Sequence, residues 1–283
     1  MNVRELATRA AAEASRLRAR YGIGMSDAVC PFELADRIGI SVRLIALSSF
    51  EGIYAREPRP AIFLSSERPA GRRRYSCAHE IGHHVFGHGT CLDELLDDDP
   101  EQWSPDEFLA HRFAAGLLMP KIAVEAAFAR RGWSLKSPRP SEVHVVAQDF
   151  GVGYTTLIGH MERTLRCVPS TVASALRKVK LPQLRSDLAG FRINQDLVVA
   201  DDHWGQRPIE LEIGDVVVIP ASAGLAGACG AYKTRPRAHI VATIPGRGSL
   251  VLSNSRSIEL RVSRRGFTGL ARYRYLEEPA DAE

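Results

Sequence analysis

The sequence predicts an α+β fold in which a small sheet leads into helices that carry the functional residues, and a β-rich region follows. Three observations predict this class. Apolar residues recur at helical spacing near the N-terminus, β-branched and apolar residues fill residues 40–64, and short strand-like segments bounded by glycine, proline or serine occupy the last hundred residues. A length of 283 residues also suggests about two domains.

Composition excludes few classes of function. A hydrophobic fraction of 45% with 25% charged residues is ordinary for a soluble globular protein, and a net charge of +4 permits nucleic-acid binding without requiring it. The five cysteines are scattered and lack paired metal-ligand spacing, which favours a reducing cytoplasm. No segment reads as a signal peptide or approaches the roughly 18 apolar residues of a membrane span, so we expect no membrane contact.

The N-terminal third is predicted to hold two helices and a small sheet. Residues 3–20 form the first helix, with its arginines on a solvated face and its apolar face made by Leu6, Ala10, Ala14 and Leu17. Residues 31–38 form a short helix that begins at Pro31 and ends near Gly39. Residues 40–47 and 52–64 form the sheet. The arginines at 68 and 72–74 are expected to reach solvent, with a substrate role as the alternative.

The next helix carries a His-Glu-x-x-His pattern at residues 79–83. His79 and His83 lie four residues apart, so they share a helix face and can hold one Zn²⁺. Glu80 borders that face, where it could take a proton from metal-bound water as general base. Chance occurrence is the alternative. Against it, an apolar stripe predicts that the helix is buried, formed by Ala78, Ile81, Gly82 and Val85.

A helix over about residues 104–119 supplies a candidate third ligand. Glu107 would complete two histidines and one carboxylate and leave a fourth position for water, as a catalytic zinc site needs. Spacing alone leaves an alternative, because Ser104 and Glu107 also fit a capping box. Asp106 and the acidic run at residues 93–101 offer rival carboxylates. That run is expected to be a solvated loop, with recognition of a basic substrate segment as the alternative.

These segments resemble the ImmA/IrrE family of metallopeptidases in their order along the chain. The motifs that carry the resemblance span about residues 25–125, and they are Gly52–Tyr54, Ile62–Leu64, Arg74–His83 and Glu107–Pro120. The resemblance implies a zincin-like minimal metallopeptidase domain, which we place at residues 1–135, and it makes Glu107 a zinc ligand. It also implies a site-specific protease whose protein substrate is a helix-turn-helix repressor, with a role in stress response or mobile-element induction.

Three further histidines flank the predicted ligands. His111 stands where the family commonly has Asn, and it could orient a ligand or stabilise the oxyanion of a tetrahedral intermediate. A histidine satisfied at a helix interface is the alternative. His84 and His88 are weaker candidates, since His88 would point nearly opposite His79 on a continued helix and falls one residue short of the longer metzincin spacing.

Residues 136–168 begin with a linker at residues 136–140 and predict two helices on either side of residues 151–153. Ala147, Gly151 and Leu157 fit a helix-turn-helix loosely. If the pair read DNA, the second helix would present a thin footprint to a groove, made by Tyr154, Thr155, Thr156 and Arg163. We favour instead a helix pair packed on the peptidase domain.

Residues 181–283 predict a separate β-rich domain without a catalytic cluster, for which we expect a regulatory role, with a purely structural role as the alternative. Half-buried antiparallel strands are expected at residues 209–212, 215–219, 239–244, 249–252, 258–262 and 270–276. The whole chain is therefore predicted to be a cytoplasmic zinc endopeptidase. The alternative is a DNA-binding transcriptional regulator whose metal site is structural or vestigial.

Overall fold

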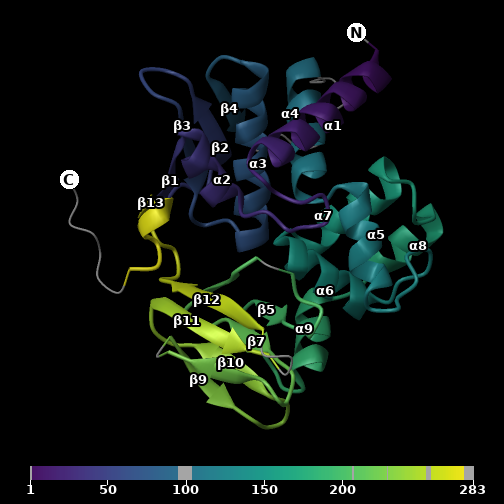
Figure 1. Cartoon of the computed structure of the whole chain (residues 1–283), viewed down its shortest axis with the longest axis vertical. Helices are drawn as coiled ribbons and strands as arrows, with labels where there is room; N and C mark the ends of the chain where they lie inside the picture. The colour runs from purple at the N-terminus through teal and green to yellow at the C-terminus, as the bar shows by residue number, and fades with distance from the viewer. Residues whose placement is uncertain (1, 95–103, 206, 228, 253–255, 277–283) are drawn as a thin grey trace. The chain divides into compact units, whose positions relative to one another are not determined.

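The protein is described here from a computed structural model, which defines residues 2–94, 104–205, 207–227, 229–252 and 256–276. The chain forms two compact units (Figure 1). Unit 1 comprises residues 1–124, 150–152 and 266–272, and unit 2 comprises residues 125–149, 153–265 and 273–283.

Unit 1 contains a five-stranded sheet in the order β13-β1-β3-β2-β4. β1 runs parallel to β3, whereas β2 pairs antiparallel with both β3 and β4. The strands are β1 (Ser41–Ile45), β2 (Phe50–Ala55), β3 (Ala61–Ser65), β4 (Cys91–Glu94) and β13 (Gly269–Leu270). The small sheet predicted between residues 40 and 64 is confirmed.

The helices of unit 1 begin and end where local chemistry favours it. A capping box formed by Asn2 and Glu5 begins α1, and Gly39 ends α2 in the left-handed conformation, with φ of 90°. The helices are α1 (Val3–Arg20), α2 (Pro31–Ile38), α3 (Ala70–Phe86) and α4 (Pro105–Leu118), and α5 (Lys121–Ala129) begins here.

Helix α3 packs on β2, β3 and α4, and α4 also packs on α1. The two central helices approach closely at Gly82, where an added Cβ would lie 3.0 Å from the Ala110 Cα and 3.2 Å from a ring carbon of Phe113. Small residues at this crossing therefore bring the functional faces of α3 and α4 together, as the alanines of α4 predicted.

Three arginines expected in solvent are buried. Arg18 is fully buried and donates hydrogen bonds to the carbonyls of Leu117, Gly24 and Asp27. Arg73 and Arg74 are less than 10% exposed, at 8% and 6%. The expectation of a solvated side chain is therefore wrong at these three positions. At Arg18 the physical reason is that carbonyl groups satisfy the buried guanidinium.

The predicted strand at residues 270–276 is wrong beyond its first residue. Only Gly269 and Leu270 pair with β1, and Ala271–Tyr273 form a 3₁₀ turn, η3. The alternating pattern has a different cause, since the turn buries Ala271 and the side chains of Arg274 and Tyr275 contact Glu210 within unit 2.

Unit 2 begins with helices and continues as two sheets. Its helical segments are the rest of α5, α6 (Pro140–Phe150, up to residue 149), α7 (Tyr154–Gly159), a π-helical turn η2 (His160–Thr164), α8 (Ser170–Arg177) and α9 (Leu181–Ala189). The predicted β-rich region therefore starts later than residue 181. Pro182 near the N-terminus and Gly190 just after the C-terminus of α9 mark this helix.

The sheets of unit 2 have four strands each, in the orders β5-β7-β10-β9 and β6-β12-β11-β8. Most pairs are antiparallel as predicted, but β5–β7 and β6–β12 are parallel. Trp204 is buried in the core between apolar strand residues. The strands are β5 (Leu197–Val199), β6 (Ile209–Glu212), β7 (Val216–Val218), β8 (Gly224–Ala226), β9 (Gly230–Lys233), β10 (His239–Ala242), β11 (Gly246–Val251) and β12 (Ser257–Ser263).

The compact units do not coincide with the predicted ranges 1–135, 136–168 and 181–283. Residues 125–135 group with unit 2, and residues 266–272 group with unit 1 because β13 extends the unit 1 sheet. Whether the three predicted ranges are independent domains stays a prediction.

Candidate metal centre

Helix α3 supplies three of the predicted site residues from its buried stretch. The helix is buried without a break from Ser76 to His83, as its apolar stripe predicted. The rings of His79 and His83 lie one turn apart with centroids separated by 4.8 Å, and their Nε2 atoms are 3.0 Å apart. The four-residue spacing thus brings both imidazoles to one point.

Helix α4 brings a carboxylate to the same point. Its N-cap residue Ser104 accepts a hydrogen bond from the backbone N–H of Asp106, which leaves the Glu107 side chain to face α3. Glu107 Oε2 lies 3.0 Å from His79 Nε2, and Glu107 Oε1 lies 3.3 Å from His83 Nε2. Of the alternatives that the spacing left open, the structure brings Glu107 to the two histidines.

The electrostatics of Glu107 favour a carboxylate. Burial alone would raise its pKa, but hydrogen bonds and charge from His79 and His83 outweigh burial and hold the pKa of Glu107 far below its usual range. Glu107 is therefore ionised at neutral pH, the form in which a carboxylate binds a metal.

The donor atoms fit a divalent cation. A tetrahedral zinc ion holds nitrogen and oxygen ligands at about 2.0–2.2 Å, which separates neighbouring donor atoms by about 3.3–3.6 Å. The two Nε2 atoms are 3.0 Å apart, and each faces a different oxygen of the Glu107 carboxylate, at 3.0 Å from His79 and 3.3 Å from His83; this group is called the triangle below. Hydrogen bonds alone explain the triangle poorly, because each Nε2 faces both the carboxylate and the other Nε2 but has a single proton or lone pair. One shared cation relieves this conflict.

Glu80 follows His79 in α3, and its side chain is fully buried. Its carboxylate rests against β2 at Gly52, where an added Cβ would lie only 2.5 Å from Glu80 Oε1. Gly52 therefore makes the space that the carboxylate occupies. Gly52 is part of the Gly52–Tyr54 motif, but the sequence alone does not show that it contacts Glu80. That contact depends on how the sheet packs on α3.

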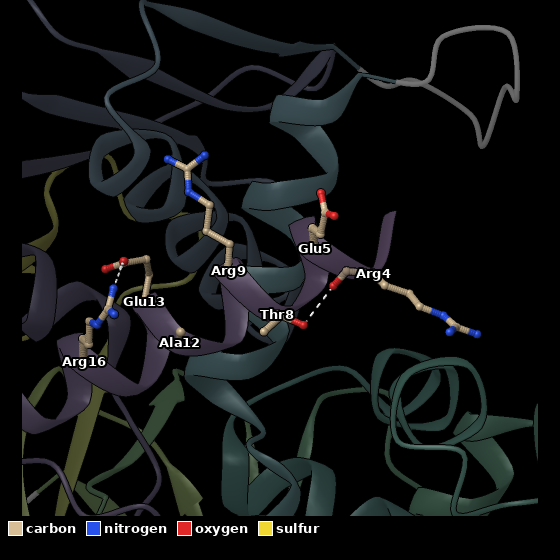
Figure 2. Close-up of a pocket in the computed structure, with 7 residues that line it drawn as sticks. All are labelled: Arg4, Glu5, Thr8, Arg9, Ala12, Glu13 and Arg16. Carbon is tan, nitrogen blue, oxygen red and sulfur yellow. Dashed lines mark hydrogen bonds and ion pairs between the residues drawn. The ribbon is translucent and has the colours of Figure 1, made fainter. Parts of the chain in front are cut away.

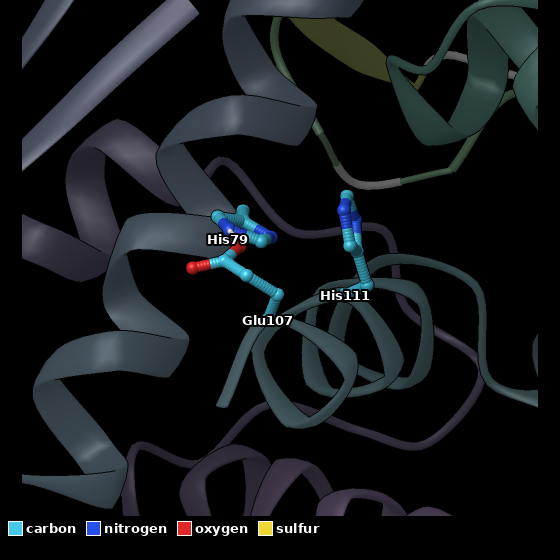
Figure 3. A group of neighbouring side chains, drawn as sticks. All are labelled: His79, Glu107 and His111. Carbon is cyan, nitrogen blue, oxygen red and sulfur yellow. Dashed lines mark hydrogen bonds and ion pairs between the residues drawn. The ribbon is translucent and has the colours of Figure 1, made fainter. Parts of the chain in front are cut away.

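His111 comes to the edge of the site from α4. Its ring centroid lies 4.3 Å from that of His79, and Tyr75 donates a hydrogen bond to its backbone carbonyl. Figure 3 shows His111 and Glu107 rising from one helix toward His79. Donor atoms of these three residues lie within 4.8 Å of one another, a looser group than the triangle with His83. His111 is exposed, so a molecule bound beside His79 could reach its ring.

The other two histidines behave differently from each other. His84 points away from the triangle, and its Nδ1 lies 2.8 Å from the Tyr54 hydroxyl. His88 was expected opposite His79, which is wrong because α3 ends at Phe86 and Gly87 turns the chain with φ of 72°. His88 Nδ1 lies 2.9 Å from His83 Nδ1. The signal for this turn was Gly87, a residue that commonly ends helices.

Three other features were predicted as possible contacts for DNA or for a protein substrate. Tyr154 is buried and donates to the Leu176 carbonyl, so it is unavailable to a DNA groove, contrary to the helix-turn-helix alternative. Arg68 and Arg72 pair with Glu51 in unit 1. The acidic run at 93–101 lies largely outside the described residues.

A hollow lies along α1 (Figure 2), and its lining includes none of His79, His83 and Glu107. It has a volume of about 470 Å³ and carries both charges, with Glu13 and Arg16 paired on its wall. Its lining comes from one helix and comprises Arg4, Glu5, Thr8, Arg9, Ala12, Glu13 and Arg16. We assign it no role.

His79, His83 and Glu107 thus bring together, on two packed helices, a set of donor atoms that suits a divalent cation. Residues 35–158 match the model of the Peptidase_M78 family, described as an IrrE N-terminal-like domain. The resemblance to ImmA/IrrE metallopeptidases is confirmed, and the match extends beyond residue 125 to include α6 and most of α7. No curated protein matches the chain. None of the helices in the described part combines the length and apolar content that a membrane crossing requires.

Proposed function

We propose that the chain is a zinc-dependent endopeptidase with a zincin-like catalytic domain. His79, His83 and Glu107 hold the metal, and Glu80 is the general base. The observation that carries this proposal is the convergence of the His79 and His83 Nε2 atoms and the Glu107 carboxylate at contacts of 3.0–3.3 Å, on a helix where the next residue after His79 is the buried Glu80. The peptidase family of residues 35–158 supports the reaction class.

Each residue has a defined task in peptide hydrolysis. A bound zinc ion supplies Lewis acidity that lowers the pKa of an attacking water toward about 7. A Glu80 carboxylate oxygen takes the proton of that water and delivers it to the leaving amine nitrogen. Glu80 is fully buried and its Oε1 rests against Gly52, so little reorganisation is needed for proton transfer. His111, exposed beside His79, donates to the oxyanion that forms on the scissile carbonyl.

The proposed substrate is another protein in the cytoplasm, a helix-turn-helix repressor. The family resemblance supports this substrate class. Co-expression of the chain with repressors encoded near it, followed by intact-mass spectrometry, should show one repressor cut at a single bond. Complex formation without fragments would instead indicate a binding partner, and salt-sensitive duplex binding without cleavage would indicate the DNA-binding alternative.

The Glu80→Gln variant tests the base directly. We expect it to retain zinc, because Glu80 is no ligand, and to lose at least about 100-fold in cleavage rate, the range that general-base removal gives. Glu107→Ala should lose both zinc and cleavage. The matched control is Glu125→Gln, an exposed position on α5, which should change neither. Full cleavage by Glu80→Gln would remove Glu80 from the mechanism.

A further inference from the structure

A short turn after α3 brings a third histidine back to the metal face. Gly87 adopts a left-handed conformation, and the backbone N–H of His88 donates to the His83 carbonyl at 3.0 Å. This closes the helix end and reverses the chain. The His88 ring then lies against that of His83, with centroids 5.0 Å apart, and stacks on Phe86.

His88 contacts a different group through each ring nitrogen. Its Nδ1 lies 2.9 Å from His83 Nδ1, and its Nε2 lies 3.2 Å from Asp106 Oδ1. The His88 side chain is only 9% exposed, whereas Asp106 is 61% exposed. Asp106 and Glu107 are neighbours in the first turn of α4. Glu107 contacts His79 and His83 directly, whereas Asp106 contacts His88, which in turn contacts His83.

The proton positions on His83 and His88 follow from the chemistry of neutral imidazole, whose two ring nitrogens offer one N–H and one lone pair. If His83 binds a cation through Nε2, its proton must be on Nδ1 and is donated to His88 Nδ1. His88 then has its own proton on Nε2, where it can be donated to Asp106. One arrangement satisfies all three groups, and it leaves the His83 Nε2 lone pair facing Glu107 and His79.

We propose that His88 is a positioning residue for the metal ligand His83, fixing its tautomer and ring orientation and linking it to the Asp106 carboxylate. This inference rests on the proposed function, since it takes His83 as a ligand. Outer partners of ligating histidines typically change metal affinity by about 10–100-fold. The His88–Asp106 pair therefore sets how tightly the site holds its cation.

The test compares two substitutions in the full chain. His88→Phe keeps a ring for packing on Phe86 but removes the acceptor, whereas His88→Asn places an amide oxygen near the position of Nδ1 and can still accept from His83. Zinc affinity is measured by competition with a chromophoric chelator. We expect about 10–100-fold weaker binding for His88→Phe and recovery to within about threefold of the parent for His88→Asn.

Two further variants separate positioning from general damage. His84→Phe changes a histidine of the same helix end that contacts Tyr54 rather than a ligand, and it should leave zinc affinity within about twofold. Asp106→Ala changes a mostly exposed side chain, so it should fold normally and weaken zinc binding severalfold. Melting temperatures of the metal-free proteins check that the variants are folded.

The outcomes also separate this inference from the proposed function. A parent chain that binds no zinc would overturn the proposed function and the inference together. A parent that binds zinc, with His88→Phe and Asp106→Ala both binding within twofold of it, would overturn the role of His88 alone. If His88→Phe fails to fold, an unchanged zinc affinity in Asp106→Ala is sufficient to overturn the proposed link from Asp106 through His88 to His83.

Discussion

Gly52 decides where the Glu80 carboxylate can lie. A methyl group at this position would come within 2.5 Å of Glu80 Oε1 and 3.2 Å of a Leu64 methyl carbon, and Glu80 is fully buried. We predict that Gly52→Ala displaces the carboxylate and lowers the cleavage rate by about 10–100-fold, the cost of misplacing a reacting group by an ångström or less. Zinc content should stay at the parent level.

Gly224→Ala is the control for Gly52→Ala, because Gly224 is also a strand residue and no heavy atom lies within 4 Å of an added Cβ there. It should cleave at the parent rate. Steady-state kinetics on a peptide spanning the cleavage site provide the measurement. An undiminished rate in Gly52→Ala would show that the Glu80 carboxylate can move without cost.

At single residues, the sequence was most informative where the chemistry is local. His79, Glu80 and His83 lie within one and a half turns of one helix, so helical geometry alone predicted their relative placement. Glu107 was ambiguous because its partner is on another helix, 28 residues earlier. His88 was misplaced because the prediction extended α3 past Gly87, which ends it.

At the scale of elements, the packing of α1 on α4 depends on one buried cation. Arg18 on α1 donates to the carbonyl of Leu117 on α4 and to two carbonyls of the loop at residues 24–27. Burial lowers its pKa to about 10, so it stays charged at neutral pH. We predict that Arg18→Met lowers the free energy of unfolding by about 3 kcal/mol, because buried carbonyls lose their donors.

Urea denaturation followed by circular dichroism measures this loss. The control is Arg16→Met on the same helix, whose side chain is 72% exposed and pairs with Glu13, and it should change stability by less than about 0.5 kcal/mol. Equal effects of the two substitutions would contradict a structural role for the buried guanidinium.

Element prediction succeeded where one pattern extends over several turns or a complete strand. The helices α1 and α2 and the strands β1 to β3 follow from apolar periodicity and from residues that start and stop helices. The short helix α9 was missed because it begins a region whose pattern is mostly that of strands. The strand predicted at residues 270–276 was too long, because a strand needs a partner and β1 pairs with it through Arg43 and Leu44. Pairing over long sequence distances is not encoded in local alternation.

At the scale of the whole molecule, chain order and spatial grouping differ. Residues 266–272 complete the sheet of unit 1 after a long excursion through unit 2, which no local pattern predicts. The proposed metal ligands, His79, His83 and Glu107, all lie in unit 1, on segments that the family match covers. Unit 2 in turn depends on contacts between its helices and its sheets, and one of these makes stability depend on pH.

His144 on α6 is 1% exposed, and its Nε2 lies 3.1 Å from the Leu197 carbonyl of β5, to which it donates. Burial lowers the pKa of His144 to about 4, although the hydrogen bond to Leu197 opposes this. The unfolded chain therefore binds more protons than the folded chain between the unfolded value of 6.5 and about 4. Stability is fully present above that window and is lost as the pH falls through it.

We predict that acidification from pH 7 to pH 5 costs the parent chain about 2 kcal/mol more in free energy of unfolding than it costs His144→Gln, which keeps an N–H donor near Leu197 but does not titrate. Urea unfolding followed by tryptophan fluorescence, with Trp204 buried in unit 2, gives both values. His203→Gln, at an exposed histidine, should keep the pH dependence of the parent. If His144→Gln keeps it as well, the folded chain accommodates a charged His144, and the link between α6 and β5 does not require a neutral ring.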